Sequence, residues 1–379
     1  MSGSILKEVT FTPHSFDNKF IFADKKRYRK LFAILENLIT SGIIVATTSS
    51  WRKDVENLIY AYDDDDKYDL EFLLKELDKN NRIVSYPDET KYLNEIEYIK
   101  HIEDLNLKRA FDFISASINN SVVKTIENID SSLYTNEGAV IDKQTVEFME
   151  KMLAPVLAYA EIVKVIDPYF NFMPLSGDNT RYTKSMEIIC KNLANHHGIK
   201  ESAEIEIHTS VKAISKRESL GKPILKWEYT ESWKNIIKDY EVRYGHKIIV
   251  YIWEEVKQED EWHDRYIDTT QCCIFMGKGL DRNDWTDSTW SLVKPDKAAN
   301  IINKFEINNN RRTYLLAAIV DSKNGTQKQK ENLCKLKSVE IYKTDEEKNI
   351  EKLQHIQRAQ DEEELRLKKI ASAKNFRRR

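Results

Sequence analysis

The residues best suited to chemistry lie in the third quarter of the chain. His263 and Arg265 are two positions apart, so on an extended strand both side chains would point to the same face. Gly277 and Gly279 follow and flank Lys278; glycine lets a backbone come close to a bound group, and Lys278 adds a second cation. An imidazole, two cations and a glycine turn together predict a surface that handles phosphate.

The elements expected to position these residues are strands of one sheet. The apolar segment 162–166 is rich in β-branched residues and predicts a central strand. Pro168 ends it and leaves Asp167 at its carboxyl end, where ligands bind in open α/β sheets. Thr209 and Ser210 end the next predicted strand. We therefore add all three polar side chains to the candidate phosphate site.

The pattern around these segments predicts an α/β fold. Further strands are expected at 205–207, 247–253, 262–268 and 272–276, with helices at 144–160, 181–194 and around 233–240. Strands and helices that alternate in this way favour a mainly parallel sheet with flanking helices.

Three regions are expected along the chain. Residues 1–140 predict an N-terminal helix-rich α/β or α+β domain whose role the sequence does not reveal. Residues 145–344 contain the candidate site, and residues 345–379 form a charged helical tail. Within the first region we expect no regular element at 1–18, a short strand at 19–23 and a solvated acidic loop at 63–66.

Composition favours a cytoplasmic protein. The net charge is −3, so attraction to nucleic acid or a membrane must be local. The four cysteines have no metal-ligand or disulfide spacing and predict reduced thiols. No apolar run approaches the ~20 residues that span a bilayer, and the N-terminus has no signal-peptide pattern. No metal or other cofactor is expected, because no His, Cys and Asp set has the required spacing.

The tail has two distinct parts. Ile350, Leu353 and Ile356 belong to a thin apolar stripe within the charged segment 345–371, a pattern typical of a coiled coil or a docking helix. Residues 366–379 include seven basic residues and no acid. This end would bind nucleic acid or anionic lipid, or would serve only as a solubilising tail.

The spacing of the candidate site resembles the phospholipase D superfamily motif HxKxxxxDxxxxxxGSxxN. Four positions match its His, Lys, Gly and Asn, namely His263, Arg265, Gly277 and Asp281. Thr270 replaces the acid and Lys278 replaces the Ser. This degenerate form is most similar to the branch that contains the C-terminal domain of the eukaryotic MIT-domain abscission protein and related bacterial domains. The resemblance covers residues 160–310.

The resemblance implies a phospholipase D-like domain and a metal-independent phosphodiesterase. One His would attack phosphorus and a second would protonate the leaving group, so a chain with one motif would need a homodimer that pairs two His263 side chains. Arg265 and Lys278 would stabilise the phosphoryl charge. Asp268 or Glu206 would have to replace the acid missing at Thr270.

Two functions follow as hypotheses. The first is a component of a bacterial antiphage defence system that acts on or binds nucleic-acid phosphodiesters, because bacterial proteins of similar layout are associated with such systems. The alternative is a non-catalytic module that binds phosphate groups, lipid headgroups or a partner protein. The eukaryotic relatives are understood to be non-catalytic and to act by binding membrane lipids. In a third reading the charged C-terminal helix recruits a partner subunit.

Overall fold

The computed structural model describes most of the chain. The described residues are 5–62, 64–86, 94–135, 138–172, 181–194, 202–216, 224–225, 227–255, 262–280, 283–307, 314–329 and 340–341. The tail predicted at 345–379 lies outside them, as do Asp281 and Cys334.

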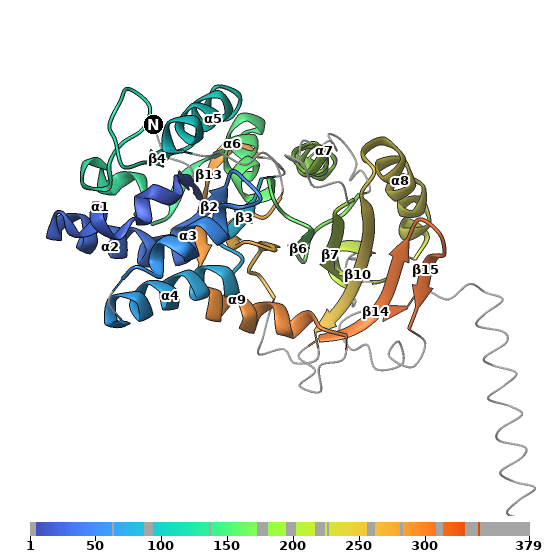
Figure 1. The fold of residues 1–379 in the computed structure, drawn as a ribbon. Coiled ribbons are helices and arrows are strands. Elements are labelled where there is room, and N and C mark those ends of the chain that lie inside the picture. The colour runs from blue at the N-terminus through green and yellow to red at the C-terminus, as the bar shows by residue number, and fades with distance from the viewer. Residues whose placement is uncertain are drawn as a thin grey trace, which may run out of the picture.

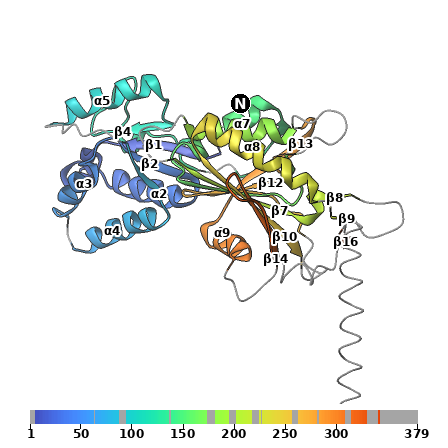
Figure 2. The same cartoon turned by 90° about the vertical axis from the view of Figure 1, so that its right-hand side faces the viewer.

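The first sheet comes from the N-terminal third of the chain, and all of its strand pairs are parallel. Its order is β3-β2-β1-β4. The strands are β1 (Lys7–Phe11), β2 (Gly42–Ala46), β3 (Ile83–Ser85) and β4 (Phe113–Ser115). The helices between them are α1 (Asn18–Phe22), α2 (Lys25–Ser41), α3 (Trp51–Ile59), α4 (Asp64–Lys79) and α5 (Glu95–Lys108). Figure 2 shows α5 on one side of this sheet and α2 and α4 on the other.

Three N-terminal expectations are wrong. Residues 1–18, where no regular element was expected, contain strand β1. The charged start of β1 does not look like a buried strand in the sequence, but Glu8 is buried in an ion pair with Arg109. The segment expected as a strand is helix α1, whose first turn is capped by the Asp17 carboxylate as it accepts from Phe20 N at 3.2 Å. The acidic residues 64–66 begin α4 rather than a loop, which suits the positive end of the helix dipole.

The second sheet has nine strands among the described residues, in the order β15-β14-β10-β7-β6-β11-β12-β13-β5. They are β5 (Val140–Gln144), β6 (Ile162–Ile166), β7 (Glu204–Ser210), β10 (Lys247–Glu255), β11 (Tyr266–Thr269), β12 (Cys273–Met276), β13 (Asn283–Val293), β14 (Tyr314–Asp321) and β15 (Gly325–Lys328).

The α/β class is confirmed, but the expected mainly parallel pairing is wrong for this sheet. Only β6–β7 and β7–β10 pair in parallel. The other six neighbouring pairs are antiparallel. For β11 and β12 the physical reason is loop length: residues 270–272 join them, and so short a connection cannot carry a crossover helix.

The two faces of the second sheet have separate cores. Val163 and Val165 of β6 face the larger core with the helices α6 (Val146–Leu157), α7 (Arg181–Ala194) and α8 (Glu228–Tyr244). Ile166 faces the smaller, aromatic core beside α9 (Pro295–Ile302). Figure 2 shows α7 and α8 on one side of the sheet and α9 on the other. The larger core also includes residues of β2, so apolar packing is continuous between the two sheets.

The remaining elements are short. A three-stranded sheet contains β8 (Ser215–Lys216), β9 (Ile224–Leu225) and β16 (Glu340–Ile341). Single 3-10 turns occur at Pro13–Phe16, Ile126–Asn128, Ser131–Leu133, Val211–Ile214 and Asn303–Phe305. Within the described ranges, no helix has the length and apolar character needed to cross a bilayer. Cys190, Cys272 and Cys273 are buried free thiols.

Candidate phosphate-binding edge of the second sheet

Asp167 anchors the candidate site at the carboxyl end of β6, as the sequence predicts. Its side chain is fully buried. One carboxylate oxygen accepts from Tyr169 N at 2.9 Å, and the other accepts from Leu280 N at 3.2 Å. Arg265 Nε lies 3.6 Å from Oδ1 and supplies the opposite charge. Backbone donors and a cation together make it possible to bury this carboxylate.

His263 and Arg265 meet at a residue that sequence reasoning missed. The Arg265 guanidinium lies 5.0 Å from the centroid of the Tyr169 ring, a cation–π contact. Nδ1 of His263 lies 3.3 Å from the Tyr169 hydroxyl. His263 is exposed, whereas the Arg265 side chain is 22% exposed. The signal for Tyr169 was its place two residues after Asp167, beyond the proline that ends the strand.

The Gly277–Gly279 turn packs against Arg265 and Asp167. Gly277 O accepts from Arg265 Nη1 at 2.8 Å. Gly279 has a φ of +64°, and a Cβ at this position would overlap with the Asp167 carboxylate and with Cδ of Arg265. The sequence predicted a close approach of this backbone to a ligand. The close approach that the structure contains is to the Asp167–Arg265 pair.

Lys278 projects from the same turn. Its ammonium donates to Thr286 Oγ1, and its backbone N donates to Ser288 Oγ at 3.2 Å. Among the described residues no carboxylate forms an ion pair with Lys278, whereas Arg265 is already neutralised by Asp167. Lys278 is therefore the better placed of the two cations to meet an incoming anion.

Thr209 and Ser210 lie at the carboxyl end of β7, next to that of β6, but in the interior of the fold. Both side chains are buried. Thr209 Oγ1 donates to Phe170 O at 2.9 Å, and Lys212 N donates to Ser210 Oγ at 3.2 Å. The Thr209 bond ties β7 to the segment after β6, whereas the Ser210 bond stays within the turn that follows β7. Both hydroxyls have structural roles in the interior.

Asp268 is not brought to His263. It is in register with Lys164 of β6 and Cys273 of β12. It follows Tyr266, which packs in the aromatic core, by two residues, so its side chain lies on that face of the sheet while Arg265 points to the other. Burial raises the pKa of Asp268 to about 7, and Lys164 opposes the shift. This position does not fit the imidazole-orienting role expected from the sequence.

Glu206 is committed elsewhere too. It forms an ion pair with Lys164 at 3.2 Å, and one of its oxygens lies 3.5 Å from Nε2 of His208. His208 is buried, accepts from Trp253 Nε1 at 3.1 Å and is stacked on Tyr251. Burial lowers the pKa of His208. This network is a packed part of the sheet face, so Glu206 orients His208 rather than His263.

Thr270, at the position of the missing acid, has a structural role. Its hydroxyl accepts from Glu161 N at 3.0 Å and from Ile162 N at 3.3 Å, which fixes the start of β6. The fourth matched position, Asp281, lies outside the described residues. Within the described ranges no cluster of three His, Cys, Asp or Glu side chains could hold a metal ion.

A cavity adjoins the exposed face of His263. Its volume is about 310 Å³. Its lining is aromatic and polar and includes Trp262, His263, Asp264, Tyr266, Ile301, Lys304, Phe305 and Tyr314. The edge at His263 is therefore open to a ligand larger than a single phosphate group.

Comparisons with known proteins add little to this geometry. No protein family and no curated protein matches the sequence. A phosphatidylserine synthase from Haemophilus influenzae Rd KW20 has 13% identity and a TM-score of 0.31; the match covers 60% of this chain and 48% of that one. The archaeal chromatin protein TrmBL2 has 10% identity and a TM-score of 0.23 over 62% of this chain and 65% of that one. These TM-scores are too low to carry an argument.

Proposed function

We propose that this chain binds nucleic-acid phosphodiesters at the edge formed by His263, Arg265 and Lys278, as a component of a bacterial antiphage defence system. One observation carries the site: the exposed imidazole and the guanidinium meet at Tyr169, and the guanidinium donates to Gly277 O in the turn that also carries Lys278. The defence context rests on the resemblance to the phospholipase D-like branch.

Binding is favoured over cleavage by the state of the acidic residues. Asp167 is buried in an ion pair with Arg265, and Asp268 is in register with Lys164 of β6 and Cys273 of β12. Both carboxylates are therefore engaged in the structure of the sheet. An exposed imidazole and an ammonium still suit an anionic oxygen.

Cleavage is the second candidate. Phosphoryl transfer through a phosphohistidine needs a nucleophile and a separate acid. In this chain the acid would be His263 of a second copy, since His208 is buried against Trp253. A phosphodiesterase therefore requires two copies that face one another across this edge.

The test is fluorescence anisotropy with 5′-labelled single-stranded and double-stranded DNA and RNA, with EDTA present. We expect Lys278→Ala and His263→Ala to weaken binding several-fold, because each removes a contact to phosphate. Lys247→Ala is the matched control. Its exposed side chain lies at the amino end of β10, whereas the candidate site lies at the carboxyl end of the parallel strand β6. It should bind like the wild type.

The same samples, run on a denaturing gel, separate the candidates. EDTA-resistant fragments that disappear in His263→Ala would establish the phosphodiesterase. Intact oligonucleotides with weakened binding in Lys278→Ala support the binding function. If no oligonucleotide binds, but anionic phosphatidylserine vesicles retain the wild type and release Lys278→Ala, the site is a headgroup receptor and the nucleic-acid proposal is wrong.

A further inference from the structure

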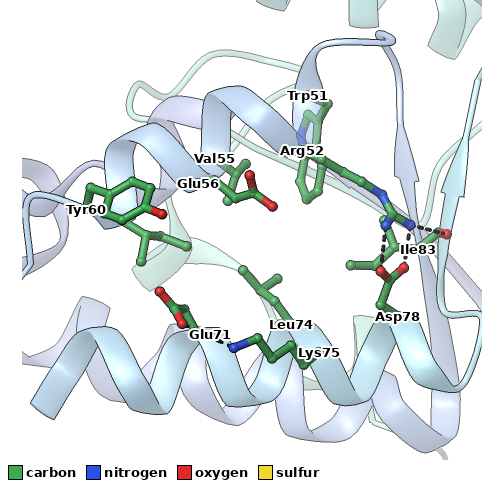
Figure 3. A pocket seen from close by; sticks show the side chains of 11 residues that line it. Trp51, Arg52, Val55, Glu56, Tyr60, Glu71, Leu74, Lys75, Asp78 and Ile83 are labelled. Carbon is green, nitrogen blue, oxygen red and sulfur yellow. Dashed lines mark hydrogen bonds and ion pairs between the residues drawn. The ribbon is translucent and has the colours of Figure 1, made fainter. Parts of the chain in front are cut away.

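A groove lies between α3 and α4, two helices that accompany the first sheet. Its volume is about 330 Å³. Figure 3 shows Val55 of α3 and Leu74 of α4 at its floor, with Trp51 and Ile83 at one end and Tyr60 at the other. An apolar floor between two antiparallel rims is the shape that receives an amphipathic helix.

Large aromatic side chains are exposed beside this groove. Tyr60 is 68% exposed, Tyr68 is 71% exposed and Phe72 is 61% exposed. Tyr68 and Phe72 are four residues apart on α4, so they form one stripe on the helix surface. Tyr60 lines the groove, and Tyr68 and Phe72 extend the exposed aromatic surface along α4 beyond the lining. Exposed aromatic rings are typical of an interaction surface.

The surface around these rings is acidic. Residues 64–71 of α4 contain five acidic side chains and one lysine. Lys67 is held 4.2 Å from the Tyr60 ring centroid, and Lys75 is paired with Glu71 at 3.3 Å. Across the groove, Arg52 is paired with Asp78 (Figure 3). The nearby cations are thus engaged, and the surface fits a basic partner better than nucleic acid.

The chain itself contains a segment with an apolar stripe and a basic end, although residues 345–365 carry eight acidic and three basic side chains. Apolar residues recur at Ile350, Leu353 and Ile356, and residues 366–379 have seven basic residues and no acid. We propose that the groove between α3 and α4 binds the C-terminal segment 345–379 of a second copy of this chain. Its apolar stripe would cover Val55 and Leu74, and its basic end would pair with the acidic start of α4.

A second copy fits better than the same chain. Figure 2 shows β8, β9 and β16 at the opposite end of the molecule from α3 and α4, and the segment begins just after β16. Two copies that exchange these segments reciprocally would form a closed dimer. The inference does not depend on the proposed function.

The first experiment measures oligomeric state by analytical ultracentrifugation of the full chain. We expect a dimer for the wild type and a shift to monomer for the double variant Tyr68→Ser/Phe72→Ser. These side chains are exposed, so the fold should be retained, which a far-UV spectrum would verify. Leu107→Ser, at an 86% exposed position on α5, is the matched control and should remain dimeric.

The second experiment identifies the occupant. An equal mixture of isotopically heavy and light full-length chains is treated with a carbodiimide, which joins lysine amines to carboxylates. We expect heavy–light cross-links between Lys368 or Lys369 and Asp65 or Asp69. Asp65→Lys/Asp69→Lys and Lys368→Glu/Lys369→Glu should each weaken the dimer, and combining all four changes should restore it.

Any one of the following results would overturn the proposal. A monomeric wild type, cross-links within one chain alone, or a dimer that survives Tyr68→Ser/Phe72→Ser would show that this groove does not receive the segment of a second copy. If Lys368→Glu/Lys369→Glu weakens oligonucleotide binding and no cross-link to α4 forms, the basic end contacts nucleic acid instead.

Discussion

At the scale of single residues, the candidate site is organised by the buried Asp167 carboxylate. Tyr169 N, Leu280 N and Arg265 all satisfy it, and Gly279 leaves the space that it occupies. The residues that the sequence assigned to phosphate binding therefore divide into two groups. Asp167, Arg265 and Gly279 pack together and form the framework of the site, while His263 and Lys278 are its solvent-facing side chains.

Gly279→Ala tests this packing. The left-handed φ costs an L-residue about 1–2 kcal/mol, and overlap of the new methyl with Asp167 and Arg265 should add about 1–3 kcal/mol. Gly245→Ala is the matched control, since its φ is +78° and nothing lies within 4 Å of its Cβ. Urea unfolding should show a loss from Gly279→Ala well above that from Gly245→Ala. Equal losses would contradict the close packing.

Arg265→Ala tests the ion pair. Removal of the guanidinium leaves the Asp167 carboxylate buried without its opposite charge, and we expect a loss of about 2–3 kcal/mol in the free energy of unfolding. Arg243→Ala breaks an exposed ion pair with Asp239 and should leave the free energy of unfolding close to that of the wild type. If the two variants unfold at the same urea concentration, the pair contributes nothing to stability.

At the scale of elements, a charged row crosses three neighbouring strands. Asp268 of β11, Lys164 of β6 and Glu206 of β7 are in register. The Asp268 carboxyl is buried enough to have its pKa raised to about 7. In the unfolded chain the same group ionises near pH 4. The folded state therefore holds the proton more tightly between these values, and its stability must fall as the pH rises through that window.

Asp268→Asn should remove this dependence. We expect the variant to be more stable than the wild type at pH 8, by on the order of 2–4 kcal/mol, and similar to it at pH 4. Thermal or urea unfolding across this pH range measures the difference. A stability gap that does not grow between pH 4 and pH 8 would show that the Asp268 carboxyl has an ordinary pKa.

The elements also show what the sequence could and could not predict. Apolar runs such as 162–166 and 272–276 predicted their strands because burial demands them, and Pro168 correctly marked the end of β6. Strand direction was missed, although the short connection 270–272 already excluded a crossover helix. β1 was missed because Glu8 looks exposed in sequence, and its partner Arg109 is about a hundred residues away.

The site shows the same limit. Spacing brought His263 and Arg265 to one contact, but not by the predicted strand, since β11 begins at Tyr266. They meet because Tyr169, from a different segment, lies against both. Asp268 was assigned to the site from its proximity in sequence, and the pairing of β11 with β6 places it beside Lys164 instead. The positions of these side chains are set by contacts between segments that are distant in the sequence.

At the scale of the whole molecule, two interaction surfaces lie apart. The phosphate-binding edge belongs to the second sheet, and the groove between α3 and α4 belongs to the first sheet's helices (Figure 1). With a net charge of −3, the chain has no global attraction for phosphate, and the acidic α4 would repel it. Any nucleic-acid binding should therefore depend on a few local cations.

The salt dependence of single-stranded DNA binding tests the central claim most directly. If Lys278 contacts a backbone phosphate, the slope of log K against log salt concentration should be shallower in Lys278→Ala by about 0.7, the value of one lost contact to a single strand. Lys247→Ala, at the amino end of β10, should keep the wild-type slope. A slope that is unchanged in Lys278→Ala, or equally changed in both variants, would contradict phosphate binding at this edge.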